Sequence, residues 1–115
     1  MNIEATIIEY LSEALDVPVS ADVPTKRPDA FVTVERLGGN LSDVALDHAG
    51  VAVQSWAGTR LGASELMEQV DTAMRDMDVL NVSKVYRNSI SNFPDPDNSM
   101  GRYQGYYEIV FYKED

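Results

Sequence analysis

Residues 51–77 read VAVQSWAGTRLGASELMEQVDTAMRDM, and within them an alternating pattern gives way to a helical one. Residues 51–56 alternate with the two-residue period of a β-strand, and Thr59 can cap the helix that follows. That helix has an apolar stripe at Leu66, Val70, Ala73, Met74 and Met77. The side chains expected to face water are Glu65, Glu68, Gln69, Asp71, Arg75 and Asp76.

The chain before this segment predicts a second helix and three strands. Apolar residues at Ile3, Ile7, Leu11 and Leu15 form one helical stripe, which ends near Pro18. Residues 17–23 predict a short strand, which Pro18 within it and Pro24 after it confine to an edge of the sheet. Residues 31–37 are rich in β-branched side chains, and Gly38-Gly39-Asn40 predicts a hairpin turn. Residues 44–56 form the return strand, with an expected bend at residues 47–50.

The chain after residue 77 predicts two further strands. They cover residues 82–90 and 103–112 and are separated by a loop at residues 91–101 that is rich in proline and aspartate. The last three residues, 113–115, have the character of a tail. The order α-β-β-β-α-β-β predicts a single α+β domain over residues 1–115, with a mostly antiparallel β-sheet and two helices packed on one face.

The last strand has more apolar surface than two helices on one face can cover. Tyr106, Val110 and Tyr112 alternate with a second apolar set, so both faces of the strand need a cover. The second set is Tyr103, Tyr107, Ile109 and Phe111. A partner subunit is expected to cover the face that the helices leave open.

Composition excludes several classes of function. The chain of 115 residues has no cysteine, so disulfides, thiolate metal sites and cysteine nucleophiles are ruled out. Nineteen acidic against nine basic residues give a net charge of −10, which argues against binding to a phosphate backbone. The first 15 residues lack the pattern of a signal peptide, and no run approaches the ~20 apolar residues of a membrane span. We expect a cytoplasmic protein.

His48 is the only histidine, and Asp47 and Ser42 near it could form a hydrolytic triad. Their order and spacing match no such motif, and a hairpin arm supplies neither an oriented base nor a strained nucleophile turn. A solvated histidine in a turn is the better interpretation. The glycines at residues 38–39 and 58–62 lack the spacing of a phosphate-binding loop.

Asp95, Asp97 and Ser99 resemble the opening of a calcium loop. The sixth position requires glycine and the twelfth glutamate, but the chain has Met100 and Tyr106 there, so a proline-containing turn is favoured. We therefore predict no catalytic, cofactor-binding or metal-binding residue, and the chain is expected not to be an enzyme.

Trp56 stands where the strand meets the helix that follows it. A large aromatic side chain at such a junction is expected to close the core between the sheet and that helix, and the alternative is a ligand platform. The excess of acidic over basic residues has two interpretations. It can be an ordinary soluble surface, or some of it can line a path along which DNA slides without sticking.

Three segments together resemble the tail terminator (tail completion) proteins of long-tailed phages and prophages. They are Phe31-Val32-Thr33-Val34-Glu35-Arg36-Leu37-Gly38-Gly39, Val53-Gln54-Ser55-Trp56-Ala57-Gly58-Thr59-Arg60, and Asn92-Phe93-Pro94-Asp95-Pro96-Asp97 followed by Arg102-Tyr103-Gln104. Their order and spacing agree over nearly the whole chain. The sequence departs from the family at Gly62, where relatives tend to have good helix formers, so the second helix is expected to begin a turn late.

The resemblance implies a homo-oligomeric ring, usually of six copies, in the virion at the head-proximal end of the tail. Such a ring stops polymerisation of the major tail tube protein and offers a surface to the head and neck connectors, while DNA passes through its lumen. The candidate assembly residues are Phe93, Asp95, Asp97, Arg102, Tyr106 and Tyr112. The loop at residues 91–101 has little to bury, so we expect a neighbouring subunit to order it and not its own domain. The alternatives are another head-to-tail joining protein, or a small enzyme or ligand-binding domain with an intersubunit site.

Overall fold

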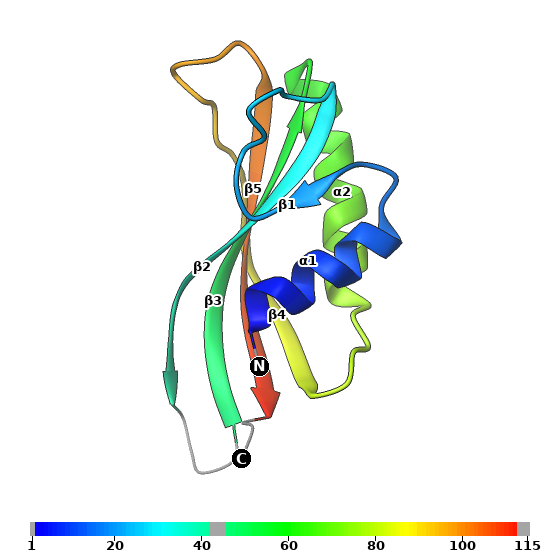
Figure 1. The fold of residues 1–115 in the computed structure, drawn as a ribbon. Coiled ribbons are helices and arrows are strands. Elements are labelled where there is room, and N and C mark those ends of the chain that lie inside the picture. Colours follow the sequence, from blue (N-terminus) through cyan, green and yellow to red (C-terminus); the bar gives the residue numbers. More distant parts are fainter. Residues whose placement is uncertain (1, 42–45, 113–115) are drawn as a thin grey trace.

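The computed structural model describes residues 2–41 and 46–112, which form one five-stranded sheet with both helices on the same side (Figure 1). Ser42, Val44 and the tail at residues 113–115 lie outside the described residues. The elements are α1 (Ile3–Ala14), β1 (Val19–Ser20), β2 (Ala30–Leu41), β3 (Leu46–Ala57), α2 (Arg60–Arg75), β4 (Val82–Asn92) and β5 (Gly101–Tyr112).

The strands lie in the order β1-β2-β3-β5-β4, and every neighbouring pair except β1 and β2 is antiparallel. The predicted α+β fold and its element order are therefore confirmed. β1 lies at an edge, as its flanking prolines require, and the Val32 N–H donates to Pro18 O across 2.9 Å.

The two helices begin where their capping residues predict. The Asn2 side chain accepts from Ala5 N, and Thr59 Oγ1 accepts from Gly62 N, both at 3.0 Å. α2 starts at Arg60, so the expectation that Gly62 delays it is wrong. Gly62 supplies the donor for the cap, and a Cβ there would lie only 3.2 Å from Ala57 Cβ and from Thr59 Oγ1.

The main core lies between the helices and the facing side of the sheet. It contains one continuous cluster of buried apolar side chains from α1, α2, β2, β3 and β5, and each buried aliphatic side chain contributes about 1.5–3 kcal/mol. The cluster includes Ile3, Ile7, Leu11, Val32, Val34, Val51, Val53, Leu66, Met67, Val70, Met74, Tyr107 and Ile109.

Two expectations about β2 and β3 are wrong. Gly38 and Gly39 lie within β2, after a register shift at Arg36, and do not form the turn. A Cβ at Gly39 would collide with the carbonyl oxygen of His48, so glycine is needed there for close approach to the paired strand. β3 is not interrupted at residues 47–50, because it pairs with β5 in one unbroken register from Leu46 to Ala57.

Candidate functional site: the open face of the sheet

Neither helix covers one face of the sheet, which we call the open face. Because side chains alternate along each strand, the register assigns three sets of residues to it. They are Phe31, Thr33 and Glu35 from β2, His48, Ala52, Gln54 and Trp56 from β3, and Arg102, Gln104, Tyr106, Glu108, Val110 and Tyr112 from β5. The open face therefore holds three of the six predicted assembly residues.

Trp56 is buried, with 1% of its surface exposed, but it lies on the open face and not between the sheet and α2. Its neighbour Ser55 faces the helix instead and donates from Oγ to Ala63 O across 2.8 Å. Trp56 stacks on Phe31 with ring centroids 5.3 Å apart, and its indole N–H donates to Thr33 Oγ1 across 3.2 Å. The predicted burial is confirmed, and the predicted partner is wrong.

Trp56, Phe31 and Thr33 form a second, smaller core on the open face. Two guanidinium groups complete it. Arg27 and Arg102 lie 5.1 Å and 4.7 Å from the centre of the Trp56 ring, which favours cations over its face. Arg102 also lies 4.3 Å from the centre of the Phe93 ring. The side chains thus alternate between aromatic and cationic groups and join residues 21–29 and the loop at residues 93–100 to the sheet.

The loop at residues 93–100 is held by contacts within its own chain. Arg102 donates to the carbonyl oxygens of Phe93 and Pro94, and Asp95 lies 3.9 Å from Arg27. Asp95 Oδ1 accepts from Asp97 N across 2.9 Å, as in an Asx turn. The expectation that only a neighbouring subunit orders this loop is therefore wrong. Phe93 nevertheless keeps 41% of its surface exposed.

The structure separates the predicted assembly residues into groups. Phe93, Asp95, Asp97 and Arg102 gather at the end of the molecule where the orange loop lies in Figure 1. Tyr106 lies midway along β5, with its hydroxyl so close to Gly50 that a Cβ there would collide with it. Tyr112 is 50% exposed and lies about 33 Å further along the strand than Arg102, at the opposite end.

A row of polar side chains crosses the middle of the open face, and sequence reasoning missed it. Thr33 Oγ1 contacts Gln54 Oε1 at 3.4 Å, and Gln54 Nε2 donates to Gln104 Oε1 at 2.9 Å. The three residues are paired across β2, β3 and β5 in one register, which only the strand pairing could reveal.

His48 lies in β3 and not in a turn, and its Nδ1 is 3.5 Å from Glu108 Oε2. Asp47 follows the strand alternation onto the helix side, away from His48. The side chains of these two residues are therefore not arranged as base and orienting acid. His48 and Glu108 also border a hollow of about 570 Å³ at this end of the open face, together with Lys84, Tyr86 and Val110.

Asp71 differs most from its expected place on the solvent side of α2. It is only 7% exposed and lies between α2 and the sheet. The Tyr107 hydroxyl donates to Asp71 Oδ1 across 2.8 Å, and Arg87 Nη1 donates to Oδ2 across 2.9 Å. Arg75 Nη1 lies 3.4 Å from the same Oδ2. Asp71 therefore connects α2 to both β4 and β5.

Burial in the core, followed by the hydrogen bond to Asp71, raises the pKa of Tyr107 well above its ordinary value of 10.0. The unfolded chain ionises this phenol above pH ~10, whereas the folded protein keeps it neutral. Its contribution to stability is therefore fully present below that pH, and stability should fall by up to ~1.4 kcal/mol per pH unit above it.

Tyr107→Phe should remove this part of the alkaline loss. The measurement is the free energy of unfolding of both proteins at about pH 9 and about pH 11, where the variant should show the shallower decline. Equal slopes for the two proteins would contradict the assignment. The comparison uses slopes because the variant also leaves Asp71 without its hydroxyl donor.

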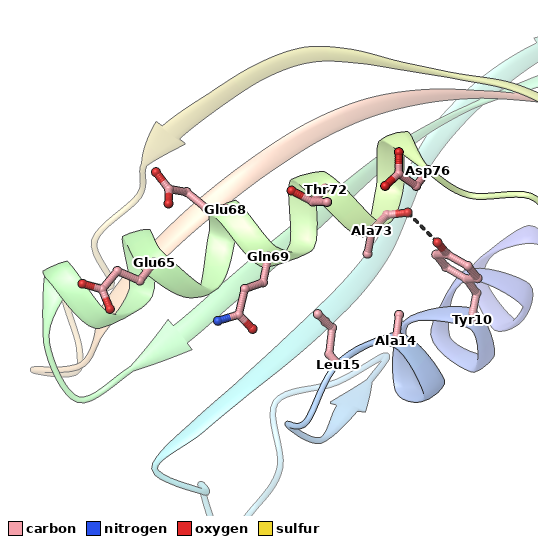
Figure 2. Close-up of a pocket in the computed structure, with 9 residues that line it drawn as sticks. All are labelled: Tyr10, Ala14, Leu15, Glu65, Glu68, Gln69, Thr72, Ala73 and Asp76. Atoms are coloured by element: carbon pink, nitrogen blue, oxygen red, sulfur yellow. Dashed lines mark hydrogen bonds between the residues drawn. The ribbon is translucent and has the colours of Figure 1, made fainter.

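A groove of about 590 Å³ runs between α1 and α2 on the other side of the molecule (Figure 2). Tyr10 closes one end by donating to Ala73 O across 2.7 Å. Figure 2 shows the carboxylates of Glu65, Glu68 and Asp76 spread along α2 and pointing in different directions. They do not converge on one point, and residues 2–41 and 46–112 contain no cluster of three or more potential metal ligands.

No family model and no curated protein matches this sequence. In the described parts of the chain, neither helix is long and apolar enough to cross a lipid bilayer.

Proposed function

We propose that this protein is a structural subunit of the tail terminator type. It would form a ring, usually of six copies, on the head-proximal end of a phage tail tube, stop tube growth and present a docking surface to the head connectors. The sequence resemblance supplies the identity of the assembly. The α+β fold, with its long sheet and two helices on one face, is compatible with that family.

The observation that carries the proposal is the open face, which neither helix covers. Its two ends present Phe93 and Tyr112, which are 41% and 50% exposed, and Tyr86 on the neighbouring strand is 46% exposed. Large aromatic side chains of this kind are favoured in contacts between subunits. The chain's net charge of −10 also suits a lumen through which DNA passes without sticking.

The direct test is deletion of the gene from the phage or prophage that encodes it. Electron microscopy of the tails should then show tubes of abnormal length, and the protein supplied in trans should restore the normal length. Tails of normal length would overturn the terminator role. If such tails also failed to join heads, the protein would instead belong to the neck.

Phe93→Ala tests whether the anchored loop takes part in assembly. The side chain is 41% exposed, so its loss should shift the melting temperature by only a few degrees. We expect the variant to lose complementation of the deletion strain. Leu80→Ala is the matched control, because Leu80 is 84% exposed in the turn before β4. A large loss of stability in Phe93→Ala with complementation intact would contradict the assignment.

A further inference from the structure

We propose that β4 is the strand through which one copy of this chain joins the next. Its free edge would pair, antiparallel, with the free edge of β2 in a second copy. The inference rests on the proposed ring for the number of copies in the assembly, whereas the pairing itself follows from the sheet.

The sheet has two unequal edges with unused backbone groups. β4 pairs with β5 along one side. On its other side the Val82 N–H donates to Val79 O across 3.0 Å, and within the described residues no other strand pairs with that side. β1 covers β2 only at Val32 and Thr33. Beyond that point the Arg36 N–H donates to a Glu4 carboxylate oxygen across 2.7 Å. Such edges are templates for another strand.

The direction of the strands fits a head-to-tail contact. Successive neighbours from β2 through β3 and β5 to β4 are antiparallel, so β4 runs opposite to β2. A second copy placed to continue the sheet therefore presents its β2 antiparallel to β4. The two contact surfaces differ, and contacts of this kind close into rings when the rotation between copies allows it.

Charge is complementary between the two edges. β4 has no acidic residue, in a chain whose net charge is −10, and of its two cations Arg87 already pairs with Asp71 while Lys84 does not. The edge at β2 has Glu35 on the strand and Glu4 of α1 beside it, where the Glu4 carboxylate accepts from the Arg36 N–H. Each edge also exposes an aliphatic side chain. Ile90 on β4 is 37% exposed and Leu37 on β2 is 51% exposed.

The alternation of backbone groups identifies a position that tests the pairing. Phe93 N donates to Arg102 O across 2.9 Å, so Ser91 also turns its polar groups toward β5. Ile90 then turns its N–H to the outside. Ile90→Pro removes that outward donor and is compatible with an edge strand, whereas the control Ile90→Thr keeps it.

The readout is disulfide cross-linking, because the chain has no cysteine of its own. Ser89→Cys would be placed in one population, and Leu37→Cys or Glu35→Cys in another, all on the open face. After mixing and oxidation, with and without tail tubes, we expect cross-links between the two populations and loss of those links when Ile90→Pro is added. Ile90→Thr should retain them, and all variants should keep a melting temperature near that of the parent.

The outcomes separate this proposal from the proposed function. Links only within the Ser89→Cys population would show β4 pairing with β4 and overturn the β2 partner. No links, or links that survive Ile90→Pro, would overturn the edge pairing. Lys84 and Arg87 would then be charged residues that keep β4 from pairing with another chain. The same variants would be supplied in trans to the deletion strain, and the length of its tails would be measured. This assay would show whether the terminator role fails as well.

Discussion

Trp56→Ala is expected to lower the free energy of unfolding by about 3–5 kcal/mol, enough to unfold many domains of this size. The side chain is 1% exposed and stacks on Phe31, with Arg27 and Arg102 over its ring. Its removal leaves a cavity on the open face and takes away the surface on which the two guanidinium groups pack. Residues 21–29 and 93–100 should therefore loosen together.

Chemical denaturation monitored by far-ultraviolet circular dichroism measures this effect without relying on tryptophan fluorescence. Trp56→Phe is the matched variant, because it keeps an aromatic ring on Phe31 and loses the indole N–H that bonds Thr33 together with part of the ring. It should cost less than the alanine variant. A midpoint for Trp56→Ala within error of the parent would show that the second core does not stabilise the fold.

The sequence predicted the elements and their order, because both helices have clear stripes and recognisable caps. It could not determine which face of β3 the helices cover. Val51 and Val53 on one side of the strand are matched by Ala52 and Trp56 on the other, so local alternation is ambiguous. The choice depends on the packing of β3 against α2 and on its pairing with β5, which the alternation within β3 alone does not reveal.

The prediction of a hairpin turn at residues 38–39 was wrong for a related reason. Gly-Gly-Asn is typical of a hairpin turn, but glycine is also needed where two backbones approach closely. At Gly39 the neighbouring His48 carbonyl leaves no room for a Cβ, and the strand continues to Leu41. That neighbour is defined by the pairing of β2 with β3, which a turn motif alone does not reveal.

The helical period did contain a signal for the burial of Asp71. Asp71 follows Met67 by four positions and precedes Met74 by three, and both methionines are buried. An acidic residue on that stripe is normally assigned to solvent because an isolated buried carboxylate is unfavourable. Its partners, Tyr107 and Arg87, come from other strands, so the sequence offered no local reason to place it inside.

Asp71→Ala is expected to lower the free energy of unfolding by about 2–4 kcal/mol. Most of the loss comes from Tyr107, whose buried hydroxyl would lose its acceptor at a cost of about 1–3 kcal/mol. The ion pairs contribute less, since the Arg87 and Arg75 side chains are 44% and 59% exposed and each pair is worth about 0.2–1 kcal/mol. Asp71→Asn keeps an acceptor and should lie between Asp71→Ala and the parent.

Arg75→Ala is the control, because it removes one exposed partner and leaves the contacts of Asp71 with Tyr107 and Arg87 in place. Denaturant midpoints should therefore fall in the order parent, Arg75→Ala, Asp71→Asn and Asp71→Ala. Hydrogen exchange should show the largest loss of protection in β4, which Asp71 ties to α2 through Arg87. An Asp71→Ala variant no less stable than Arg75→Ala would mean that the carboxylate is dispensable, and that apolar packing alone holds α2 against β4 and β5.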